Sequence, residues 1–170
     1  MLDWTGLIQR HIGGGENPPR DRDGENETPE TYLEKLYCEE GKPLEARKAL
    51  TEFLNRELGG NASFAVLRRA LALAWLIPHG DFAPVLREVF KRFRTDNPRI
   101  SLILLRAMSV IPPLLDASSR ERGEWTEMWL GMLEDPLYGV AAFQGLRKCD
   151  LSLAARHIRV FVDVGFVLLG

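Results

Sequence analysis

Apolar positions recur along most of the chain with the spacing of amphipathic helices. Thr28 and Pro29 are typical of a helix cap and first turn, and apolar side chains then follow three and four residues apart until Gly41. A second segment of the same kind begins at Pro43 and ends at the glycine pair 59–60. Because the connection between the two segments is short, we expect two antiparallel neighbouring helices.

Three later segments share one internal pattern. They open at Asn61, at Asn97 with Pro98, and at Asp135 with Pro136, residue types that favour helix starts. Each segment carries a small residue near its middle, and these residues lie 37 and 38 positions apart: Ala70, Ala107 and Gly145. A small residue at this place predicts a close approach between two helix backbones.

A second series of apolar pairs alternates with the first. Its members recur at intervals of 40 residues: Leu50 and Phe53, Phe90 and Phe93, Leu130 and Leu133. Two alternating series predict a repeating unit that is a helical hairpin of about 36 to 40 residues.

A unit of this length, with Asn-Pro or Asp-Pro before its second helix, resembles the HEAT and armadillo-like family of helical repeats over about residues 43–170. The period differs from the 34 residues of tetratricopeptide repeats. The resemblance implies an all-α fold, a short right-handed α-solenoid of HEAT-like hairpins. An irregular helical bundle is the alternative, because several amphipathic helices would give a weaker form of the same pattern.

The pattern divides the chain into three parts. Residues 1–12 form an amphipathic arm, residues 13–28 a flexible charged linker rich in Gly, Pro and Asn, and residues 29–170 the helical-repeat domain. Such an arm either packs back on the same chain, which is the simpler arrangement, or docks on another molecule.

The last segment, from Asp150 onward, is the most apolar part of the chain. Read as a helix, it has a narrow polar stripe made of Arg156, Arg159 and Asp163. We expect it to be covered by the arm, by another subunit or partner, or by a continuation of the chain. Val162 and Phe166 are the candidate residues for an oligomer or partner surface.

Composition predicts a soluble protein. The 170 residues are 45% apolar and 27% charged, and no run of 18 apolar residues predicts a membrane span. The first residues lack the basic start of a secretory signal. Cys38 and Cys149 form no CxxC pair, so neither a disulfide scaffold nor a cysteine zinc site is predicted, and a cytoplasmic location is expected.

No sequence motif indicates catalysis, a metal or a cofactor. His11, His79 and His157 lie far apart and form no HxxxH or HExxH pair. The three glycines at 13–15 are not followed by the Lys-Ser/Thr of a phosphate-binding loop. We therefore predict no catalytic residue, no metal site and no cofactor, and we favour a binding protein over an enzyme.

Basic residues give the one indication of function. Residues 1–60 carry 8 basic and 13 acidic side chains, whereas residues 61–170 carry 14 basic and 11 acidic ones. On the second helices of the hairpins, which line the concave surface of HEAT-like arrays, lie Arg68, Arg69, Arg99, Arg106, Arg147 and Lys148. A further cluster stands at the end of a first helix: Lys91, Arg92 and Arg94.

These residues predict a protein–protein interaction module or adaptor whose groove binds another protein, and an acidic protein or peptide would suit it. The candidate contacts are Arg69 and Arg106, which occupy equivalent repeat positions, together with Lys91, Arg92, Arg94 and Arg99. For Arg147 and Lys148 we favour a structural role, since basic residues late in a helix complement its dipole.

Two other functions remain open. A nucleic-acid-binding protein, such as a HEAT-like DNA glycosylase, would need an aromatic ring and a carboxylate beside a basic groove, for which Trp75, Trp125 and Asp135 are the candidates. A homo-oligomeric structural subunit would assemble through the last helix. Trp125 and Trp129 lie one helical turn apart, and we predict that both belong to the core.

Overall fold

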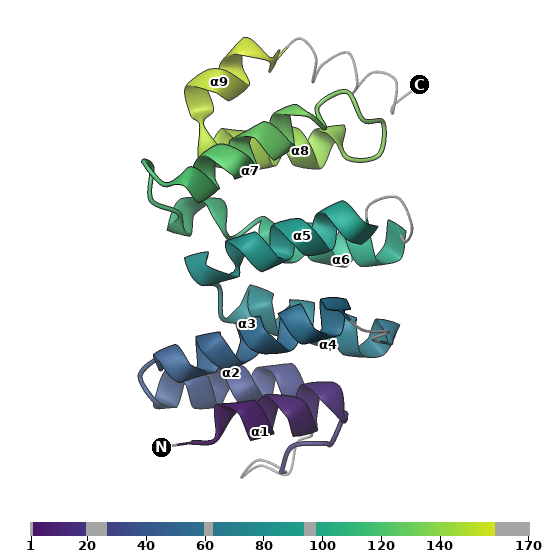
Figure 1. The fold of residues 1–170 in the computed structure, drawn as a ribbon, viewed down its shortest axis with the longest axis vertical. Helices are drawn as coiled ribbons and strands as arrows, with labels where there is room; N and C mark the ends of the chain where they lie inside the picture. The colour runs from purple at the N-terminus through teal and green to yellow at the C-terminus, as the bar shows by residue number, and fades with distance from the viewer. Residues whose placement is uncertain (1, 20–26, 60–62, 94–97, 159–170) are drawn as a thin grey trace. The chain divides into compact units, whose positions relative to one another are not determined.

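The structure, a computed structural model, describes residues 2–19, 27–59, 63–93 and 98–158, with the side chains of residues 58 and 98–102 left out. All regular structure in these ranges is helical, which confirms the all-α fold class (Figure 1). The α-helices are α1 (Trp4–Ile8), α2 (Pro29–Glu39), α3 (Leu44–Gly59), α4 (Phe64–Leu76), α5 (Ala83–Phe93), α6 (Pro98–Met108), α7 (Arg120–Leu130), α8 (Gly139–Cys149) and α9 (Leu151–Arg156). Short helical turns are η1 (Gln9–Gly13), η2 (Gly80–Phe82) and η3 (Pro112–Leu114).

The chain forms two compact units, Met1–Met108 and Ser109–Gly170. The first unit contains α1 to α6, and the second contains η3 and α7 to α9. In the first unit, α1 packs against α3 and α3 against α5, while α2 packs against α4 and α4 against α6. In the second unit, α8 packs against α7, α9 and η3.

From the short connection between them, the sequence predicts that α2 and α3 are antiparallel neighbours. In the structure, both helices make their main contacts with other helices. Gly41 and Lys42 both have positive φ angles, 75° and 61°, which turn the chain sharply between them. α2 then lies against α4, and α3 lies against α1, α4 and α5. The apolar faces of α2 and α3 are therefore buried mainly against helices other than each other.

The first twelve residues pack back on the same chain, one of the two arrangements considered for the arm. Trp4, Leu7, Ile8 and Ile12 are all buried. α1 contacts α3, and η1 contacts α2 and α4. The arm is thus part of the first unit's core; of the expected linker 13–28, residues 20–26 lie outside the described residues.

Helix starts agree with the sequence in one case and differ in another. The Thr28 side chain accepts a hydrogen bond from the backbone N–H of Thr31 at 3.3 Å, as expected of the cap of α2. The carboxylate of Asp135 instead closes a turn, accepting from the N–H groups of Leu137 and Tyr138 at 2.8 and 3.1 Å. α8 therefore begins only at Gly139.

A similar difference occurs at the start of α4, where Ser63 is the cap and accepts from the N–H of Val66 at 3.3 Å. Asn61 and Asn97, the predicted openings of α4 and α6, lie outside the described residues.

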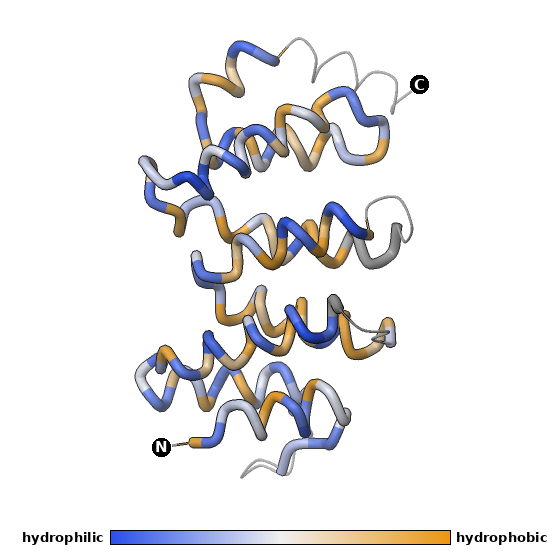
Figure 2. The backbone as a smooth tube through the Cα atoms, in the orientation of Figure 1, coloured by the Kyte–Doolittle hydropathy of each residue, from blue (hydrophilic) through white to orange (hydrophobic). Residues whose placement is uncertain are grey.

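The small residue at the centre of each predicted second helix is buried, as the sequence indicates: Ala70, Ala107 and Gly145. At Gly145 the neighbouring helix packs tightly, because an added Cβ atom would collide with the ring of Trp129. Trp129 packs edge to face against Trp125 with 5.9 Å between ring centroids, and both are buried, which confirms that they belong to the core. Figure 2 shows apolar and polar positions mixed along the described chain.

One arginine ties the elements of the second unit together. Arg122 of α7 is half-buried, and its Nε and Nη2 donate to the carbonyl oxygen of Cys149 at 3.0 and 2.6 Å. Its Nη1 donates to the carbonyl oxygens of Leu115 at 2.9 Å and Pro112 at 3.3 Å. Carbonyls at helix ends have no partner inside the helix, so this guanidinium satisfies the ends of both α8 and η3.

The Gly145→Ala substitution tests the close approach of α7 and α8. We expect it to lower the free energy of unfolding by about 1–3 kcal/mol, because the added Cβ collides with the buried Trp129 ring. Gly123→Ala is the matched control, since a Cβ there meets nothing within 4 Å, and it should raise stability by about 0.5–1 kcal/mol. Urea unfolding followed by tryptophan fluorescence measures both, and equal effects would contradict the packing described.

The Arg122→Met substitution tests the hydrogen bonds from Arg122 to the carbonyl oxygens at the ends of α8 and η3. We expect a loss of about 2–4 kcal/mol, because the part-buried carbonyl oxygens of Cys149, Leu115 and Pro112 lose a charged donor. Arg120→Met is the control: Arg120 is 93% exposed and pairs with Glu124 at 2.8 Å on the surface, so the change should cost less than about 1 kcal/mol. The two variants are compared by thermal and urea unfolding, and similar losses would show that Arg122 has no special role.

Candidate binding groove

Helix α4 has almost no polar face. In its sequence, FAVLRRALALAWL, the polar residues are Arg68 and Arg69. A helix that is apolar on nearly all sides has to be covered by other elements. α2, α3 and α6 cover much of α4, yet Ala72, Trp75 and Leu76 stay half-exposed.

These half-exposed residues form part of the floor of a groove with a volume of about 490 Å³, here called the α4–α6 groove. Leu71 and Ile103 complete the apolar floor. Arg68 and Arg106 line the same groove, together with Thr28 and Glu30 from the start of α2. Among the described residues that line the groove, there are two guanidinium groups and one carboxylate.

Trp75 and Arg106 are joined by a cation–π contact at the groove. The guanidinium carbon of Arg106 lies 4.0 Å from the centroid of the Trp75 ring. The other three tryptophans are buried, with exposed fractions of 4% or less: Trp4, Trp125 and Trp129. Trp75 is therefore the tryptophan that the described structure leaves accessible to a ligand, and Arg106 is fixed beside it.

Of the two arginines that the sequence placed at equivalent repeat positions, only Arg106 lines the groove. Arg69 is half-buried, and its Nη1 donates to the carbonyl oxygen of Ile12 at 3.1 Å. Its guanidinium also fills the space beside Gly15, which has a φ angle of 68°. Arg69 thus holds the end of the N-terminal helical segment, and its neighbour Arg68 takes the place expected of it at the groove.

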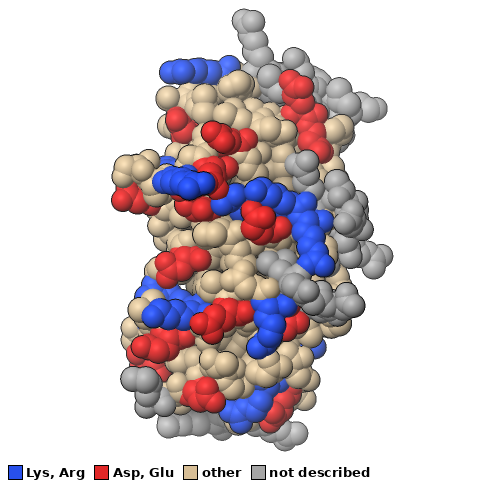
Figure 3. All heavy atoms as spheres, viewed as in Figure 1, with Lys and Arg blue, Asp and Glu red and all other residues tan. Residues whose placement is uncertain are grey.

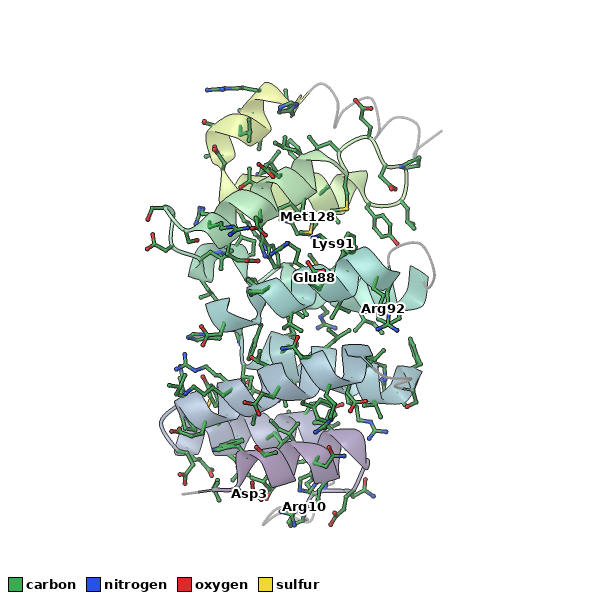
Figure 4. The ribbon with its side chains drawn as sticks, viewed as in Figure 1. Asp3, Arg10, Glu88, Lys91, Arg92 and Met128 are labelled. Carbon is green, nitrogen blue, oxygen red and sulfur yellow. The ribbon has the colours of Figure 1, made fainter. Side chains whose placement is uncertain are left out.

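Lys91 and Arg92, two of the other basic candidates, are not among the residues that line this groove. Lys91 and Arg92 are exposed on the last turn of α5, as Figure 4 shows. The Nζ of Lys91 lies 2.9 Å from Oε1 of Glu88, and the guanidinium of Arg92 lies over the Phe93 ring, 5.3 Å from its centroid. Outside the described residues or side chains lie Arg94, Arg99, Val162 and Phe166.

The sequence analysis placed Arg68 on a groove-lining helix without choosing it as a contact, and it named Trp75 only as a candidate aromatic ring for nucleic-acid binding; the structure brings both to the groove. The signal that could have found them is their separation of seven residues on one apolar helix, which puts both on the same face.

Two of the three histidines, His11 and His79, have structural partners. His11 is buried, and its Nδ1 lies 2.9 Å from the carbonyl oxygen of Glu16. His79 bonds to Arg47 through Nε2, and its Nδ1 lies 3.0 Å from Oδ2 of Asp81. Among the described residues, no group of three or more His, Cys, Asp or Glu side chains could hold a metal ion.

The surroundings of Cys149 and Trp125 do not favour a reactive thiol or a ring that stacks on a base. Burial raises the pKa of the Cys149 thiol above its usual value, which keeps it protonated and a poor nucleophile at neutral pH. Trp125, a candidate for stacking on a nucleic-acid base, is completely buried, and its Nε1 donates to Oε1 of Glu121 at 2.9 Å.

The visible surface carries charges of both signs. On the face shown in Figure 3, acidic and basic side chains are interspersed. A surface that attracts nucleic acid over a long range usually gathers basic side chains on one face instead.

Comparison of the chain with protein-family models, with curated proteins and with solved structures finds no match in any of the three. In the part of the chain that the structure describes, every helix is too short or too polar to cross a membrane. The function of this chain is therefore inferred from the groove itself.

The Arg69→Met substitution tests the structural role of Arg69. We expect it to loosen the N-terminal helix and to cost about 1–2 kcal/mol, because the Ile12 carbonyl loses its charged donor. In this variant, the rate of hydrogen exchange at the backbone amides of residues 2–12 should increase. Arg68→Met, one residue away, is the control and should leave exchange in this segment unchanged; the opposite ranking would assign the structural role to Arg68.

Proposed function

We propose that this protein is a protein-interaction module that binds an acidic segment of a partner protein in the α4–α6 groove. The observation that carries the proposal is the incomplete cover of α4, whose apolar side chains are half-exposed between the guanidinium groups of Arg68 and Arg106. An apolar floor with charged groups beside it is the common arrangement of a peptide-binding surface.

Tryptophan and arginine, two residue types present at the groove, are those that often contribute most binding energy at protein interfaces. Burying the Trp75 ring and the neighbouring aliphatic carbons would supply affinity at roughly 25 cal/mol per Å² of apolar surface. The two guanidinium groups would select carboxylates and speed association, which makes the binding sensitive to salt.

The wider architecture that we propose is a short HEAT-like α-solenoid. Supporting it, the first unit packs its alternate helices in order: α1 on α3 on α5, and α2 on α4 on α6. The hairpin of α7 and α8 in the second unit has the same two-helix order. In such an array the second helices line one concave surface, and the groove lies on two of them. We also propose a cytoplasmic location, which the free thiols of Cys38 and Cys149 support.

Site-specific cross-linking tests where a partner binds. The photoreactive residue p-benzoylphenylalanine replaces Leu76 in the groove, and in a control protein it replaces Leu151, which is 67% exposed on α9. In an extract of the source cells, we expect the groove variant to cross-link one specific protein through an acidic segment, identified by mass spectrometry. Cross-links at Leu151 only, or none at either position, would contradict the proposal.

Charge reversal tests the role of the two arginines in the same experiment. Arg68→Glu/Arg106→Glu should lower cross-linking from Leu76 at least about tenfold, since two attractive charges become repulsive. Lys35→Glu/Lys48→Glu changes the net charge equally at exposed positions outside the groove and should leave cross-linking unchanged. Equal loss in both double variants would show that only net charge matters.

A further inference from the structure

We infer that the segment bound in the α4–α6 groove is an amphipathic helix with two acidic side chains seven residues apart and apolar residues midway between them. The inference rests on the proposed function and adds to it the conformation and charge spacing of the partner. Three observations carry it: the spacing of the α4 residues that line the groove, the positions of Arg68 and Arg106, and the half-exposed side of α4.

The floor has the periodicity of a helix-packing surface. On α4 the lining residues recur at steps of three, four, seven and eight from the first: Arg68, Leu71, Ala72, Trp75 and Leu76. This is the stripe by which one helix contacts another. α4 is covered by helices on its other sides, and Ala72 at the middle of the stripe leaves room for a close neighbour. One further helix would complete the cover of α4.

The positions of Arg68 and of the Trp75–Arg106 contact define a length along the axis of α4. Arg68 and Trp75 are seven residues apart, so their Cα atoms are separated by about 10 Å along the axis of α4. The Arg106 guanidinium stands over the Trp75 ring, and thus marks the second end of this interval. A bound helix that runs along α4 would meet the two guanidinium groups with side chains about two turns apart.

A helix satisfies this spacing, and a strand does not. Residues seven apart on a helix are about 10 Å apart and lie on the same face. In a strand, 10 Å corresponds to three residues, whose side chains point to opposite faces. On the helix, the positions three and four after the first acid would face Leu71 and Ala72.

Charge at the groove supports acids at these two positions. Carboxylates form strong, directional pairs with guanidinium groups, and the contact with Trp75 holds Arg106 in place for such a pair. Glu30, half-buried where α2 meets the groove, would repel an acid placed beside it. The groove therefore favours two acids at defined places over a uniformly acidic segment.

Synthetic peptides test the spacing directly on the full-length protein. The first is fluorescein-labelled, with glutamates at its fourth and eleventh positions, leucines at the seventh and eighth, and alanine and glutamine elsewhere. The second has the same composition with the later glutamate moved to the ninth position, which turns its carboxylate to another face of the helix. We expect fluorescence anisotropy to show that the first binds at least about tenfold more tightly, and circular dichroism to show that it gains helix on binding.

Reciprocal charge reversal separates a direct contact from a structural effect. Arg68→Glu/Arg106→Glu, verified as folded by circular dichroism, should lose the first peptide and gain a version with lysines at the fourth and eleventh positions. Lys35→Glu/Lys48→Glu should keep the original preference. A loss without the reciprocal gain would overturn the assignment of the two arginines as the groups that meet the acids.

The outcomes distinguish this inference from the function on which it rests. If both glutamate peptides bind equally, or if the partner segment cross-linked through Leu76 binds without gaining helix, the helical spacing is wrong and the groove remains a binding site. If no segment is cross-linked through Leu76 and neither peptide binds, the groove function and the inference both fail. Preference for the seven-residue spacing with reciprocal rescue would support both.

Discussion

The apolar character of α4 is the constraint on which the first unit depends. With only Arg68 and Arg69 as polar residues, this helix is stable in water only when other elements remove its remaining faces from solvent. α2, α3, α6 and the end of the N-terminal segment all contact it. Its cover is incomplete at the α4–α6 groove, where Ala72, Trp75 and Leu76 stay half-exposed.

Arginines serve two different purposes in this structure, which their neighbours decide. Arg69 and Arg122 donate to backbone carbonyls at helix ends, where the helix itself offers no partner. Arg68 and Arg106 instead line an apolar groove, and Arg106 stacks on the Trp75 ring. A basic residue on a second helix is therefore not by itself evidence of binding, because the carbonyls within its reach compete for the same donor groups.

The groove explains how a chain without catalytic motifs could act with specificity. Its affinity would come from Trp75 and the aliphatic floor, and its selectivity from the guanidinium groups of Arg68 and Arg106. Both features belong to rigid helices, so little of the binding energy would be lost in ordering the site. A partner helix would in turn stabilise the first unit, because it completes the burial of α4.

By itself, the sequence determined the all-α class, the cap at Thr28, the stop at Gly41, the core position of Trp125 and Trp129, and the burial of the small residues that include Gly145. These features depend on local periodicity and on residue types with strong backbone preferences, which neighbouring residues are sufficient to express. Only the tertiary structure decided that α2 packs on α4, that Arg69 holds the end of the N-terminal segment, and that Arg68 and Trp75 meet Arg106 at one groove. Such contacts depend on which apolar faces cover one another across many residues, and the direction of a long side chain is settled by the carbonyls and rings that this packing brings within its reach.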